Sequence, residues 1–307
     1  GDSRVSLTTA AQSSDSSGDV LLATGDSSTT SGKVLITSGD GATAGNVILQ
    51  SGSSTTGVGA ATSIAGGDSE VNKGGDLNLA AGSGVSGGDL SISSGSGSTA
   101  AGGDVSISAG EGAGMAPGGT VSIEAGSSTG ADFNGGSLKV HGGQALEGSS
   151  QGGKVAIEGG SAESGVGGSV TIAGGTSVSG ISGSVEVTTP SATPGTGDIT
   201  IMTGDSGSGN SGSVSIQSGD SASASAGGIS IQAGDSNIEG SAVALQGGAG
   251  QAGGSVLLAA GVASEDGSGG AVKLAGRESV SIHTNAQSSR DSGRVDIATR
   301  ASVDSSS

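Results

Sequence analysis

The stretch Gly103–Gly110 reads Gly-Asp-Val-Ser-Ile-Ser-Ala-Gly, and the same pattern returns along almost the whole chain. Residues 212–219 repeat it as Gly-Ser-Val-Ser-Ile-Gln-Ser-Gly. The general unit is Gly-x-Φ-x-Φ-x-small-Gly, where Φ is an aliphatic residue. Positions within a unit are counted from the first Φ, which is position 0. The two Φ residues, at positions 0 and +2, are called the Φ pair.

The unit occurs 21 times in 307 residues. Nineteen of the 20 spacings between first Φ residues lie between 13 and 17, and the exception is 8, between Val272 and Val280. A fixed period of this kind is typical of repeat proteins that stack one small unit on the next. The first Φ positions, one of which is a Thr, are Val5, Val20, Val34, Val47, Thr62, Leu77, Leu90, Val105, Val121, Leu138, Val155, Val170, Val185, Ile199, Val214, Ile229, Val243, Val256, Val272, Val280 and Val295.

The positions of the unit differ in what they accept. Position +4 is Ala, Ser, Thr or Gly in all 21 copies, while Gly stands at −2 in 17 copies and at +5 in 16. Positions −2, 0, +2 and +4 share one parity, so on a strand they would form one face. We interpret position +4 as a steric limit and the Gly at +5 as a corner with positive φ, which Gly adopts at least cost.

Composition restricts the kind of fold. Only 31% of the residues are hydrophobic, and the chain has 67 Gly, 1 Phe and no Trp, Tyr or Cys. Burying one Φ pair cannot offset the entropy lost on ordering about 15 residues, so a unit needs its neighbours. The sequence therefore predicts an all-β fold, a β-solenoid (parallel β-helix) of about 21 repeats of roughly 15 residues. Each Φ pair is expected to lie on a short parallel strand with both of its side chains buried.

Matching outward residues distinguish two ways of coiling. On such a strand, positions −1, +1 and +3 would face outward. Residues at the same outward position of stacked coils tend to be of the same type, and three consecutive copies carry Gln217, Gln232 and Gln246 at +3. This favours one repeat per coil over two. Residues 1–271 are predicted to be regular repeats. Residues 272–307 hold five of the ten basic residues and are predicted to be atypical repeats, a cap or junction, with ordinary repeat drift as the competing reading.

Few residues are of the types that form catalytic or metal sites. His141 and His283 stand far apart in the sequence, and no aromatic platform for a polysaccharide exists, so we predict no enzyme activity, no catalytic residue and no cofactor. No specific metal site is predicted. Asp76, Asp89 and Asp104 share position −1 of three consecutive copies and, if stacked, would form a weak cation column. The competing interpretation is a solvated face.

Charge and hydropathy bear on partners. The net charge of −18 argues against nucleic acid and against anionic membranes, and no apolar run approaches the roughly 20 residues of a membrane helix. End coils would invite another chain, so we expect end-to-end self-association or continuation in a longer chain. Leu21, Leu35 and Ile48 form an outward apolar row, either a lateral fibre contact or a row too small to matter.

The phrases Ser-Gly-Ser-Val-Ser-Ile-Gln-Ser-Gly-Asp (211–220) and Gly-Gly-Asp-Val-Ser-Ile-Ser-Ala-Gly (102–110) carry a family resemblance. They resemble very long Ser/Gly-rich tandem-repeat surface proteins of marine algae, diatoms and other stramenopiles among them. The resemblance implies a secreted or cell-surface location and supplies no catalytic residue. We predict a non-catalytic structural segment of an extracellular fibre, surface appendage or matrix. The alternative is an adhesin-like or ice- or mineral-binding β-solenoid rod.

Overall fold

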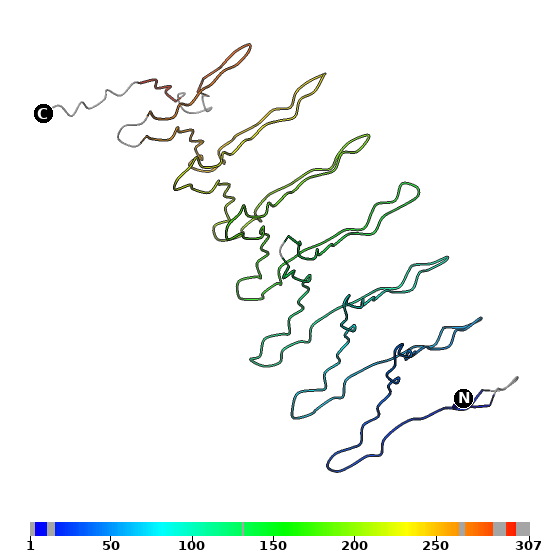
Figure 1. Ribbon diagram of the computed structural model, residues 1–307. Helices are drawn as coiled ribbons and strands as arrows, with labels where there is room; N and C mark the ends of the chain where they lie inside the picture. Colours follow the sequence, from blue (N-terminus) through cyan, green and yellow to red (C-terminus); the bar gives the residue numbers. More distant parts are fainter. Residues whose placement is uncertain (1–3, 11–15, 131, 264–267, 285–292, 299–307) are drawn as a thin grey trace. The chain divides into compact units, whose positions relative to one another are not determined.

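The structure is a computed structural model that describes residues 4–10, 16–130, 132–263, 268–284 and 293–298. The chain divides into two units, Gly1–Ala156 and Ile157–Ser307. Within the described residues of each unit the backbone forms neither helix nor β-strand (Figure 1). The described residues of each unit instead alternate between stretches that carry the Φ pairs without a bend and loops, most of which turn at a bend.

The prediction of an all-β solenoid is therefore wrong. No backbone hydrogen bond joins one Φ pair to another anywhere in the described ranges, so no ladder and no stacked coil forms. The alternation of apolar and polar residues specifies which side chains share a face. It does not specify which backbone lies beside them, and a strand exists only when such a partner is present.

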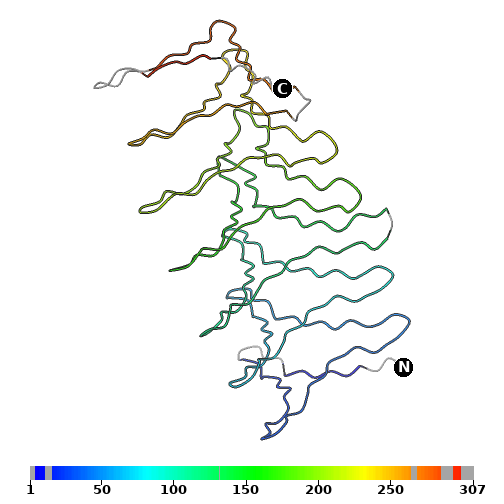
Figure 2. The same cartoon turned by 90° about the vertical axis from the view of Figure 1, so that its left-hand side faces the viewer.

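The loops lie between consecutive Φ pairs and turn sharply. Bends occur, for example, at residues 70–72, 84–86, 163–165 and 178–180, each roughly midway between two Φ pairs. Many loops are closed at their base by a backbone hydrogen bond. Some loops are narrow, with two sides that run together, whereas others open toward their tips (Figures 1 and 2). Order in the described chain is therefore local to each loop.

The Φ pairs remain in contact with water. Val105 and Ile107, the Φ pair of the stretch quoted first, are 54% and 69% exposed, and no hydrophobic side chain is buried in the described part of the chain. The expectation that both Φ side chains are buried is therefore wrong.

Two further points concern the predicted organisation. Among the residues that the structure describes, no helix is long and apolar enough to cross a bilayer. The division into regular repeats at 1–271 and atypical repeats at 272–307 stays a prediction.

Candidate functional site

The recurring structural element is a closed loop between two Φ pairs. Its base is formed by the Gly at +5, here the closing glycine, and the Gly at −2 of the next copy, here the leading glycine. The N–H of the leading glycine donates to the carbonyl oxygen of the closing glycine at 2.8–3.0 Å in ten loops. These pairs, leading glycine first, are Gly75–Gly67, Gly88–Gly82, Gly103–Gly95, Gly119–Gly110, Gly136–Gly126, Gly153–Gly143, Gly168–Gly160, Gly183–Gly175, Gly254–Gly248 and Gly270–Gly261.

Close approach explains the leading glycine. A Cβ on Gly153 would lie 2.9 Å from the nitrogen of Gly143, and one on Gly183 would lie 3.0 Å from the nitrogen of Gly175. A side chain there would force the two backbones apart. The closing glycines differ, because a Cβ on Gly143 or Gly175 would meet nothing within 4 Å.

The closing glycine is therefore not a corner with positive φ, and that prediction is wrong. In the described ranges positive φ occurs at two glycines, Gly114 and Gly148, with φ of 65° and 72°. Both stand at or beside the tip of a loop rather than at its base.

The small residue at +4 lies against the leading glycine of the next copy. Where +4 is itself Gly, as at Gly142 and Gly159, an added Cβ would overlap the carbonyl oxygen of the leading glycine. Where +4 is Ala, its Cβ faces the leading glycine, because a Cβ built on Gly119 would lie only 3.2 Å from the Ala109 Cβ. The steric limit predicted at +4 thus exists. Its source is the loop base rather than a narrowing interior.

Some described loops lack the backbone hydrogen bond at their base. Three of them follow a Thr at +4, namely Thr24, Thr189 and Thr203, and three follow Ser38, Ser218 and Ala233. The methyl group of Thr24 occupies the space beside Gly32, where a Cβ would lie 3.2 Å away. The hydroxyl of Thr24 instead donates to the carbonyl oxygen of Gly32 at 3.2 Å. The Thr284 hydroxyl likewise donates to the Gly293 carbonyl oxygen at 2.8 Å. The Ser94 hydroxyl donates to the Gly103 carbonyl oxygen at 2.7 Å in a loop that also keeps its backbone bond.

One copy departs from the pattern at two positions. Ala60 replaces the leading glycine, and its N–H reaches the Gly52 carbonyl at 3.3 Å, longer than in the ten Gly–Gly pairs. The first Φ of this copy is Thr62, whose hydroxyl forms a hydrogen bond with the Ser51 hydroxyl at 2.5 Å. The side-chain bond therefore supplements a lengthened backbone closure.

A serine at position +7, here the turn serine, organises the loop tip. In seven loops its Oγ accepts a hydrogen bond from a backbone N–H two or three residues later, at 2.8–3.2 Å. Such side-chain-to-backbone bonds stabilise turns without any tertiary contact. The turn serines are Ser27, Ser54, Ser69, Ser177, Ser206, Ser221 and Ser236.

Sequence reasoning missed the turn serine, although a signal was present. Five of the seven stand in the tripeptide Gly-Asp-Ser at positions +5 to +7, as in Gly204-Asp205-Ser206. In five other copies +7 is Gly, and a Cβ on Gly97 or Gly112 would overlap carbonyl oxygens across the turn. Extending the alignment past +5 would have shown this second constrained position.

The predicted cation column depended on stacked coils, which the described residues do not form. Asp76 instead pairs with Lys73, whose Nζ lies 2.7 Å from Oδ1, and both side chains are well exposed. In the described part of the chain no three His, Asp or Glu side chains gather to hold a metal ion. A column of Asp76, Asp89 and Asp104 stays a prediction.

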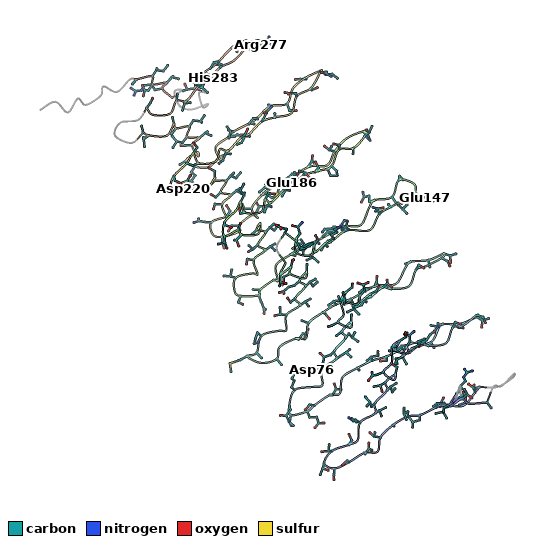
Figure 3. The ribbon with its side chains drawn as sticks, in the orientation of Figure 1. Asp76, Glu147, Glu186, Asp220, Arg277 and His283 are labelled. Carbon is teal, nitrogen blue, oxygen red and sulfur yellow. The ribbon has the colours of Figure 1, made fainter. Side chains whose placement is uncertain are left out.

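The labelled side chains stand separately along the chain (Figure 3). In the first unit Asp76 and Glu147 lie on separate segments. In the second unit the ring of His283 lies 3.3 Å from the Ser281 hydroxyl, a contact within its own segment. The predicted lateral row of Leu21, Leu35 and Ile48 is 88%, 70% and 78% exposed, and its role as a contact stays a prediction.

The described residues enclose no pocket. The arrangement is repetitive, since closed loops with exposed polar tips alternate with exposed Φ pairs. The chain matches no family model, no curated protein and no solved structure.

Proposed function

We propose that this chain is a non-catalytic structural segment of an extracellular fibre, surface appendage or matrix. The observation that carries the proposal is the recurrence of one closed loop, from Gly67–Gly75 to Gly261–Gly270, with the same glycine pair at its base. A catalytic or ligand site needs residues that differ from their neighbours and converge on one point. A structural polymer needs the reverse, which is one local solution used many times.

The extracellular part of the proposal is supported by the resemblance to Ser/Gly-rich surface repeats and by composition. Small, polar and acidic residues dominate the exposed loops, and the net charge of −18 keeps such a chain hydrated. A binding rod for ice or mineral would present a regular array of like side chains. Position +1 of the consecutive copies at Val105, Val121 and Leu138 is Ser106, Ser122 and Lys139, which supports the structural role instead.

Localisation tests this proposal. An antibody raised against residues 97–126 should label the outside of intact cells of the source organism and the insoluble wall or sheath fraction. Labelling confined to the cell interior would contradict it. Immunogold labelling of extended filaments would separate a fibre from an amorphous matrix.

A further inference from the structure

The Φ pairs are the largest set of groups that the closed loops leave without a role. Every described copy except the one that begins at Thr62 exposes two aliphatic side chains, and the first Φ is about half exposed in most copies, as at Val155 (47%) and Val214 (52%). Isolated apolar side chains on a surface are ordinary. An aliphatic pair that recurs in 20 of 21 copies and stays about half exposed or more is not.

Charged residues are almost absent from the positions that alternate with the outward ones, namely −2, 0, +2 and +4. The chain has 10 Lys or Arg and 28 Asp or Glu, and only Glu278 stands at position −2, 0, +2 or +4 of any of the 21 copies. The neighbours of the Φ pair at those positions are the leading glycine and the small residue. A second backbone can therefore approach the Φ pair without meeting a long or charged side chain.

We infer that the Φ pairs are contact points between copies of this chain, with the Φ pairs of one copy covered by those of a second copy. This inference rests on the proposed structural role, which requires copies that adhere. It places the contact on the Φ pairs rather than on the outward row of Leu21, Leu35 and Ile48.

Three features select a second copy as the partner. A second copy has the same spacing of 13 to 17 residues, so its Φ pairs match along the length, and many weak contacts add up within one complex. The uncharged positions around the Φ pair let two such faces meet without like-charge repulsion. The aliphatic Φ side chains are also 46% exposed or more, so covering them with the Φ pairs of a second copy would remove apolar surface from water on both copies at once.

Other partners fit less well. Nucleic acids and anionic lipid surfaces are repelled by a net charge of −18. That charge also opposes self-association at long range. Salt screens this repulsion, since the Debye length falls from about 30 Å at 0.01 M to about 3 Å at 1 M, while contacts between apolar side chains persist. Self-association through the Φ pairs should therefore strengthen as salt rises.

Two variants of the full 307-residue chain, each with six changes to Asn, separate the contact from general effects of substitution. The first changes the second Φ of six copies: Ile92, Ile107, Ile123, Ile201, Ile216 and Ile231. The matched control changes the preceding outward residue of the same copies: Ser91, Ser106, Ser122, Thr200, Ser215 and Ser230. Neither variant alters the net charge, and each places the same residue type in the same six segments.

Sedimentation velocity is measured over a hundredfold range of protein concentration in 0.02, 0.15 and 1 M NaCl. Wild type and control should rise above the monomer mass of 27.9 kDa with concentration and with salt. The Φ variant should associate more than about tenfold more weakly, because each Asn removes an apolar contact. A wild type that stays monomeric in 1 M NaCl overturns the inference. Equal association of both variants overturns it too, while leaving the structural role and its localisation test untouched.

Discussion

The N–H of Gly153 donates a hydrogen bond to the carbonyl oxygen of Gly143 across 2.8 Å, and a Cβ on Gly153 would lie 2.9 Å from the nitrogen of Gly143. The first fact gives the loop its closure, and the second explains why the leading residue has no side chain. This contact holds the eleven residues from Gly143 to Gly153 in a loop without help from a core.

Gly153→Ala should open this loop. The added methyl group forces the two backbones apart, and a net hydrogen-bond contribution of roughly 0.5–1.5 kcal/mol is lost. Amide exchange at residue 153, followed by NMR, should then accelerate by roughly 2- to 13-fold, which is that free energy expressed as a rate ratio. The matched control is Gly143→Ala, whose Cβ meets nothing within 4 Å and should leave the exchange rate unchanged. Equal effects from the two variants would show that close approach is not the reason for the leading glycine.

Ala60→Gly should strengthen a closure. The Ala60 N–H lies 3.3 Å from the Gly52 carbonyl, against 2.8–3.0 Å for the Gly–Gly pairs, so removing the methyl group lets the bond shorten. Amide exchange at residue 60 should slow by about two- to fivefold, within the free energy of one hydrogen bond. Ala61→Gly adds the same backbone freedom one residue away and should not slow exchange at residue 60. Slowing by both variants would assign the effect to backbone freedom instead.

Ser177→Ala should loosen a loop tip. The Gly180 N–H donates to the Ser177 hydroxyl oxygen at 2.8 Å, and removing this acceptor should cost about 1 kcal/mol, as at other turn and cap positions. Amide exchange at Gly180 is the readout. Ser177→Asp keeps an acceptor and should retain the protection, while Ser179→Ala should have no effect. Loss of protection in the Asp variant would mean that the hydroxyl has another role.

Ala109→Leu should disturb one loop base and nothing beyond it. The Ala109 Cβ lies against Gly119, so a longer side chain displaces the N–H of Gly119 from the Gly110 carbonyl, now 2.9 Å away. Ser108→Leu changes the neighbouring outward residue and should be nearly neutral. Chemical-shift changes in the first variant should stay within residues 105–121. Changes that spread to several neighbouring copies would indicate coupling between repeats, which the described residues do not show.

The loop base shows which features of the fold could be predicted from the sequence and which could not. The invariant smallness of position +4 correctly indicated a steric limit, because a position that accepts only Ala, Ser, Thr or Gly reports a close neighbour. The alternation of the sequence could not show which residue this neighbour is. In the structure Ala109 faces Gly119 at the loop base rather than the interior of a solenoid. The glycine at +5 was recognised as part of a turn, but its role is to present a carbonyl oxygen, as Gly143 does, rather than to adopt positive φ.

The Φ pairs show where prediction failed. The alternation around Val105 and Ile107 fits a half-buried strand equally well whether or not another backbone lies beside it. Strand formation depends on that second backbone, which lies outside the local pattern. Missing the turn serine had a different cause, since Ser177 and its equivalents lie two residues past the end of the aligned unit.

Residue-resolved amide exchange of the dilute wild-type chain in low salt tests most directly whether its order is local. Protection above the unstructured rate should be confined to the leading-glycine and loop-tip amides, such as those of Gly153 and Gly180, at roughly 2- to 13-fold. The amides of Val105 and Ile107 should exchange at unstructured rates. Protection of these Φ-pair amides by more than about 100-fold, with one shared exchange rate along the chain, would contradict local order, because only a cooperative hydrogen-bonded core behaves in that way.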